Sequence, residues 1–161
     1  MASKDDFSTH EWITIQAFIV FFIKLAAQLG GNLSSEIKLA GFALKERSFN
    51  AKYPLTKEIL LWNGTPEEEK ARTMLIQSGN YDLIVNQSIN LLKAKLSEEE
   101  LDEIRSSLFY VAENISRVGL RNKPNAKEKM YLAQTLFDQT LAFGILDLQK
   151  FKKTVLAIQS H

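Results

Sequence analysis

Apolar residues recur at helical spacing along most of this chain. From residue 81 to 95, and again from 98 to 116, apolar side chains return every three or four residues, which is the period of one helix face. No stretch alternates apolar and polar residues for long enough to predict a strand. We therefore expect helices at 8–29, 34–48, 66–77, 81–95, 98–116, 126–143 and 147–159, with a short helical turn at 56–62.

Capping residues support these boundaries. In four places a capping side chain stands three residues before a carboxylate, so that each can accept a backbone N–H that the helix leaves unpaired. These pairs are Ser8–Glu11, Thr65–Glu68, Ser97–Glu100 and Asn125–Glu128. Glycine or asparagine follows several predicted helix ends, where the left-handed backbone of a C-cap favours them, at residues 30–32, 64, 79–80 and 144.

The helix predicted at 8–29 is expected to lie at the centre of the fold. Its apolar residues cover nearly every side, and Ala17 to Ile23 form an unbroken apolar run, as is typical of a buried helix. Thr14, Gln16, Lys24 and Gln28 interrupt the segment, which therefore falls short of the roughly 18–20 apolar residues of a membrane span. We predict an all-α, cytoplasmic single domain over residues 1–161, built as a compact bundle of about seven helices.

The aromatic residues mostly fall at core spacing, so we expect them to be buried. The alternative is a hydrophobic groove for a lipid or a peptide. The residues concerned are Trp12, Phe18, Phe21, Phe22, Phe42, Phe109, Tyr110, Tyr131, Phe137, Phe143 and Phe151.

Composition removes several classes of chemistry. The chain has no cysteine, which excludes disulfides, thiolate nucleophiles and zinc–thiolate sites. Its net charge of +1 gives no field that would argue for a nucleic-acid partner. Neither G-x-S-x-G nor a glycine-rich phosphate loop occurs. We therefore expect no enzymatic activity. We interpret His10 as a partly exposed residue at a helix end, and the alternative is a role in weak metal binding or pH sensing.

Charged residues offer two further candidates. Acidic runs at 67–69 and 98–103 begin helices, where the helix dipole favours negative charge, and metal binding by them remains an open alternative. Basic residues bracket the helix start predicted at Asn125 and could bind phosphate or an acidic partner. The alternative is a solvated face. The candidate interaction residues are Arg117, Arg121, Lys123 and Lys127, with Lys129 beside them.

A helical hairpin pattern occurs twice in the chain. One helix ends at Ala26-Ala27, passes through Gly30-Gly31-Asn32 and is followed by a helix that opens with Ser34-Ser35-Glu36. The second copy runs from Val111-Ala112 to Ala126-Lys127-Glu128. This pattern resembles the TerB-like tellurite-resistance family, in which an alanine-rich helix end, an Asp-Gly turn and a Ser-x-Glu helix start recur in each half.

The resemblance implies two pseudo-repeated helical hairpin units, related to the helical N-terminal domain of a membrane-anchored DnaJ-like co-chaperone. It implies a non-enzymatic role in tellurite and stress resistance, through protein partners that include membrane-associated ones, or through metal sensing. Gly30 stands where the family tends to place an aspartate, which leaves Glu36 and Glu128 as the matching acids for a divalent metal.

Two alternatives remain open at this point. One is a small-molecule or lipid-binding domain, or an enzyme, with a pocket beside the first helix. The other is homo-oligomerisation through the phenylalanine-rich helix.

Overall fold

The described part of the chain is helical. The computed structural model describes residues 3–30, 33–61, 65–120, 124–129, 131 and 153, and none of these forms a strand. The elements are η1 (Lys4–Asp6, a 3-10 helix), α1 (Thr9–Gly30), α2 (Leu33–Phe49), α3 (Pro54–Leu61), α4 (Pro66–Gln77), α5 (Tyr81–Lys95) and α6 (Glu98–Leu120). The predicted all-α fold class is confirmed.

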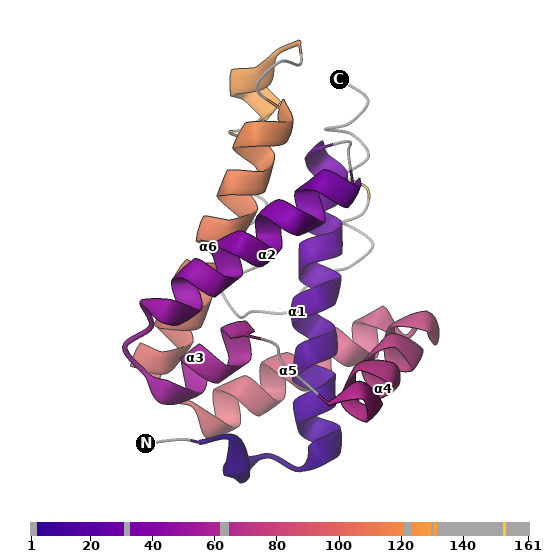
Figure 1. Cartoon of the computed structure of the whole chain (residues 1–161), viewed down its shortest axis with the longest axis vertical. Coiled ribbons are helices and arrows are strands. Elements are labelled where there is room, and N and C mark those ends of the chain that lie inside the picture. The colour runs from indigo at the N-terminus through magenta and orange to yellow at the C-terminus, as the bar shows by residue number, and fades with distance from the viewer. Residues whose placement is uncertain are drawn as a thin grey trace.

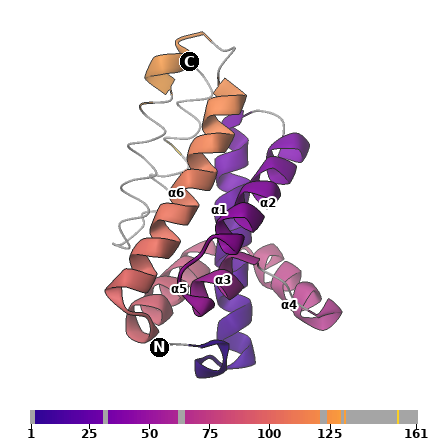
Figure 2. The same ribbon diagram turned by 60° about the vertical axis from the view of Figure 1, so that its left-hand side comes forward.

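Helix α1 organises the bundle. It runs along the long axis of the molecule, and α2 crosses it while α6 runs alongside (Figure 1). Turning the molecule by 60° shows α6, α1 and α2 side by side, with α3, α4 and α5 gathered around the N-terminal half of α1 (Figure 2). Helix α1 contacts each of the helices from α2 to α6, as expected for a central helix.

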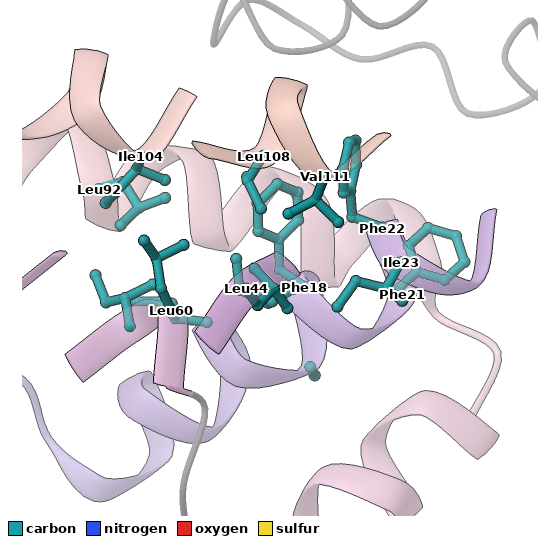
Figure 3. Close-up of a cluster of buried hydrophobic side chains, with 14 of the residues drawn as sticks. Phe18, Phe21, Phe22, Ile23, Leu44, Leu60, Leu92, Ile104, Leu108 and Val111 are labelled. Atoms are coloured by element: carbon teal, nitrogen blue, oxygen red, sulfur yellow. The ribbon is translucent and has the colours of Figure 1, made fainter. Parts of the chain in front are cut away.

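The core forms where the middle of α1 meets its neighbours. Residues 14–23 are all buried, so this stretch of α1 has no solvent face. Phe18 lies with Leu44 of α2 and Leu108 of α6 in the buried cluster of Figure 3. Burying one such side chain contributes about 1.5–3 kcal/mol. The prediction that the first helix is central and buried is confirmed, and Phe18, Phe21 and Phe22 are all buried within the chain.

Most helix boundaries follow the sequence pattern. Helices α4 and α5 have the predicted bounds, and α6 continues four residues beyond the predicted end at 116. The segment predicted as a turn at 56–62 is the complete helix α3, which starts at Pro54, a residue suited to the first helical position. Residues 126–129 and 131 are helical, as predicted. The rest of the helices predicted at 126–143 and 147–159 lies outside the described residues, apart from Lys153.

Two of the predicted capping boxes are complete. The Glu11 N–H donates to Ser8 Oγ at 3.1 Å, and the Ser8 N–H donates to Glu11 Oε1 at 2.8 Å. The same reciprocal pair joins Ser97 and Glu100, at 3.2 and 3.1 Å. Each box gives partners to amide groups that the first helical turn cannot pair internally.

The two other predicted caps differ from one another. Thr65 Oγ1 accepts the Glu68 N–H at 3.2 Å and caps α4 as predicted. Asn125 instead has a φ of 57°, a left-handed backbone rather than the extended one of an N-cap, and the N-cap prediction is wrong in this respect. Its carbonyl oxygen nevertheless accepts the Lys129 N–H at 3.0 Å.

The expectation that the aromatic residues are buried fails at Phe42 and Tyr131, which are exposed. On α2 the inner face is made by Ala40, Ala43 and Leu44. Because each helical residue turns by about 100°, Phe42 falls on the opposite face. Trp12, Phe18, Phe21 and Phe22 are buried as predicted. Phe109 and Tyr110 are partly buried, and Phe137, Phe143 and Phe151 lie outside the described residues.

Candidate functional site

The structure describes only part of the predicted basic cluster. Arg117 is exposed, and its guanidinium donates to Asn114 Oδ1 at 2.6 Å. Lys127 is exposed, whereas Lys129 is buried. Arg121 and Lys123 lie outside the described residues. The described residues therefore do not establish a joint binding surface for this cluster.

The structure does not test the predicted metal pair of Glu36 and Glu128, because the side chain of Glu36 lies outside what it describes. Glu128 is exposed, and Glu36 belongs to α2, where the position of its side chain is not described. Across the described ranges, no three histidine, aspartate or glutamate side chains are grouped so that they could hold a metal ion. In the same ranges, no helix combines the length and the apolar character that crossing a membrane requires.

A pair of exposed aromatic side chains lies on the outer face of α2. Phe42 is 74% exposed and Phe49 is 81% exposed. They are seven residues apart, which is close to two helical turns, so both rings project from the same face. Lys38, Lys45 and Glu46 are also exposed on this side of the helix. We call Phe42 and Phe49, with these three charged residues, the α2 aromatic face.

Gly41 adds a feature to this helix. A Cβ atom placed on Gly41 would meet no heavy atom of the described residues within 4 Å, so packing among them does not require a glycine here. Glycine in a helix interior costs about 1 kcal/mol relative to alanine. The open space beside Phe42 would allow another backbone to approach α2 closely.

A pocket of about 370 Å³ opens between α1 and α5. Its lining residues are His10, Glu11, Thr14, Gln87, Asn90, Leu91 and Ala94. We call it the α1–α5 pocket. His10 is exposed in the first turn of α1, as predicted. Carboxylate, imidazole and amide groups thus surround an apolar floor, an arrangement suited to orienting a small polar molecule.

Local hydrogen bonds fix the α1 wall of this pocket. Thr14 Oγ1 donates to the His10 carbonyl at 2.9 Å, and Ser88 Oγ of α5 donates to the Thr14 carbonyl at 3.2 Å. The second bond ties α5 to α1 directly behind the pocket. The wall is therefore preformed.

The charge at the pocket edge belongs to Glu11. The N–H of Ser8 lowers the pKa of the Glu11 carboxyl, and Lys95, with its Nζ 3.5 Å from Glu11 Oε1, lowers it further against the opposing effect of burial. A hydrogen bond to a carboxylate and a nearby positive charge both favour the ionised form. Glu11 is therefore a fixed negative charge at neutral pH.

The sequence indicates a pocket beside the first helix and an aromatic groove only as alternatives, and it does not identify the residues of either surface. The outer position of Phe42 follows from the 100° rotation once Ala40 and Leu44 are assigned to the core, so a helical projection of α2 would have found it. The α1–α5 pocket depends on which helices become neighbours, which local spacing does not encode. Comparison of the chain with known protein families, curated proteins and solved structures finds no match.

Proposed function

We propose that this protein is a non-enzymatic interaction domain that binds a partner protein through the α2 aromatic face. The observation that carries the proposal is the exposure of two phenylalanine rings, Phe42 and Phe49, on one face of one helix. Burying each ring against a partner would contribute about 1.5–3 kcal/mol, a gain that the chain alone leaves unused. Aromatic anchors of this kind dominate the energetics of protein interfaces.

The proposed partner is an amphipathic helix with acidic flanks. Rings at i and i+7 project about 10 Å apart along α2, a spacing that matches two turns of an opposing helix. Lys38 and Lys45 outnumber Glu46 among the charged residues of the face, so the surface favours negatively charged neighbours. Gly41 gives such a helix room to approach.

The biological setting that we propose is tellurite or general stress resistance of the TerB-like class, with membrane-associated proteins among the candidate partners. The helical hairpin pattern in the sequence and the all-α bundle around α1 support it. A metal-sensing branch of this proposal rests on Glu36 and Glu128. Calorimetric titration with calcium, zinc and manganese, repeated on Glu36→Ala and Glu128→Ala, tests that branch, and flat traces throughout would remove it.

Site-directed photocrosslinking tests the interaction. Benzoylphenylalanine, a photoreactive amino acid, should crosslink a partner in cells when it replaces Phe42. The control replaces Met74, an exposed apolar residue on α4, and should give no crosslink. The partner identified by mass spectrometry is then purified, and its affinity is measured for the wild type and for the Phe42→Ala/Phe49→Ala double variant. We expect at least a tenfold loss for the double variant.

Three results of this experiment would contradict the proposal. They are equal crosslinking at both positions, unchanged affinity of the double variant, and a partner segment without an amphipathic helix. A crosslink to a second copy of this chain would mean that the α2 aromatic face mediates self-association instead of binding a different protein. Light scattering would then measure the mass of a dimer or larger oligomer.

A second candidate function is small-molecule binding in the α1–α5 pocket. At about 370 Å³ the pocket falls within the size range of ligand sites, and Asn90 and Gln87 offer amide donors and acceptors above the apolar contact of Leu91. Native mass spectrometry of freshly purified protein should then reveal a bound small molecule. Asn90→Leu should reduce its occupancy, whereas Asn86→Leu, at an exposed position on the same helix, should not. A mass equal to that of the bare chain would count against this function.

A further inference from the structure

A second, smaller pocket lies where η1, the start of α1 and the start of α4 meet. Its volume is about 210 Å³, and Lys4, Asp5, Phe7, Trp12 and Glu68 contribute to its lining. We call it the N-terminal pocket. It is smaller than the roughly 300 Å³ at which pockets for drug-sized ligands begin, so a matching ligand would be the size of a small metabolite.

Two buried polar atoms of the lining residues have no hydrogen-bond partner in the part of the chain that the structure describes. Trp12 is only 4% exposed, and its Nε1 donor is unpaired. The carboxylate oxygen Oε2 of Glu68 is likewise buried and without a partner. Buried polar groups in native proteins are nearly always hydrogen-bonded, so an unpaired donor and an unpaired acceptor on two residues that line one pocket point to a bound molecule.

Glu68 differs from Glu11 and Glu100, the acids of the two complete predicted capping boxes. Glu11 and Glu100 occupy the equivalent third position of their helices, and each accepts the backbone N–H of its own cap residue. Glu68 gives its N–H to Thr65, as a capping-box residue does, but it lines the N-terminal pocket, and its Oε2 is buried without a described partner. Glu100 Oε2 is also buried without a described partner, but Glu100 accepts its cap N–H through Oε1, so of these three acids Glu68 alone both lacks that bond and lines the N-terminal pocket.

Opposite charges line the pocket together with aromatic rings. Lys4 Nζ lies 5.3 Å from the centre of the Trp12 ring, and the Phe7 and Trp12 rings meet edge to face at 5.8 Å. Asp5 and Glu68 supply carboxylates. A simple anion would face both carboxylates, and a simple cation would face Lys4 and leave the Trp12 N–H unpaired. A molecule that carries both charges can satisfy both sides.

We infer that the N-terminal pocket binds a small zwitterion of the α-amino-acid class. The ligand carboxylate would accept the Trp12 N–H and pair with the Lys4 ammonium, and the ligand ammonium would donate to Glu68 Oε2. This site is separate from the α2 aromatic face and does not depend on the proposed interaction function.

Calorimetry on the full chain tests the inference. Each proteinogenic L-amino acid is titrated singly, and the tightest binder is compared with its C-terminal amide and with its N-acetyl derivative, each of which retains one of the two charges. We expect saturable binding of at least one amino acid and at least tenfold weaker binding of both derivatives. The absence of saturable binding, or equal affinity for a derivative, would overturn the inference.

Two substitutions assign the contacts. Trp12→Phe removes the N–H donor and keeps an aromatic ring, and Glu68→Gln removes the negative charge. Each substitution should weaken the binding of the tightest amino acid about tenfold, the change expected when a hydrogen bond to a charged group is lost. Glu67→Gln and Glu69→Gln, at exposed positions in the same helical turn, should leave the affinity unchanged.

Further readouts separate binding from folding. Trp12→Phe removes an N–H that no described residue accepts, but it also shrinks a buried ring, so the unfolding midpoint of each protein without ligand is the baseline for its own ligand-induced shift. The tightest amino acid should raise that midpoint for the wild type and much less for Trp12→Phe. Equal shifts for both proteins would contradict the assigned contact. A crystal structure grown with that amino acid and showing only ordered water at Nε1 and Oε2 would overturn the site.

Discussion

Glu103 of α6 accepts the backbone N–H of Tyr53 at 3.1 Å and so joins the start of α3 to a helix 50 residues away in sequence. Its second carboxylate oxygen accepts the Lys52 N–H at 2.8 Å. The first amide groups of a helix have no partner within that helix, and here a side chain from another helix supplies it. A tertiary contact therefore performs the role that a local cap performs elsewhere in this chain.

Loss of this contact should destabilise the protein. We expect Glu103→Ala to lower the free energy of unfolding by about 1–2 kcal/mol, the usual effect of removing a helix cap. Urea unfolding followed by circular dichroism measures the change. Glu58→Ala is the control, because Glu58 is exposed on α3 and should change stability by less than about 0.5 kcal/mol. Equal losses in both variants would show that α3 does not depend on the Glu103 cap.

The same contact shows which parts of the fold the sequence can predict. Helices α4 and α5 carry their own start and stop signals, and their predicted bounds match the structure. Helix α3 has Pro54 as a local start signal, but the acceptor for the Tyr53 N–H comes from Glu103 of α6. A cap supplied by a distant helix leaves no pattern in the neighbouring sequence. The sequence therefore predicts only a short turn at 56–62 where the structure has the helix α3.

The candidate surfaces were less predictable than the helices. Periodicity identifies positions on a helix face but does not say which face is covered when both carry apolar residues. On α2, Leu44 is buried and Phe42 is exposed, although phenylalanine is the larger apolar side chain. The choice is made by α1 and α6, which contact α2 on its inner side. Pockets between helices depend on the same tertiary choices.

Stability should depend on pH through Glu11. Its folded-state pKa is lowered below the ordinary value of 4.5 by the Ser8 N–H, and by Lys95. A carboxyl group with a lowered folded-state pKa contributes stability that is present above the unfolded pKa and is lost as the pH falls through the folded one. We therefore expect Glu11→Gln to destabilise the protein at neutral pH and to match the wild type more closely at strongly acidic pH.

Urea unfolding of the wild type and of Glu11→Gln, from neutral to strongly acidic pH, measures how much the Glu11 charge contributes to stability. A constant difference between the two proteins at every pH would contradict the prediction. An NMR titration of the Glu11 side-chain carbon with a midpoint at or above 4.5 would contradict its cause.

Phe18 and Phe42 should respond very differently to truncation, because the first ring is buried and the second is exposed. Phe18→Ala should lower the free energy of unfolding by about 3–5 kcal/mol, because it opens a cavity between α1, α2 and α6. Phe42→Ala should change it by less than about 0.5 kcal/mol, because the ring is exposed. Chemical denaturation of both variants provides the comparison. A large loss for Phe42→Ala would mean that the chain itself covers this ring and would weaken the proposed interaction face.

Two glycines should give opposite results when each is replaced by alanine. Gly41 lies inside α2, where an added Cβ meets no atom within 4 Å, so Gly41→Ala should raise the free energy of unfolding by about 0.5–1 kcal/mol. Gly79 follows α4 with a φ of 80°, so Gly79→Ala should lower it by about 1–2 kcal/mol. Thermal unfolding measures both changes, and the same sign for the two variants would contradict the prediction.

If Gly41 leaves room for a partner helix, Gly41→Ala should also weaken partner binding while it stabilises the free chain, because the added methyl group meets only the partner.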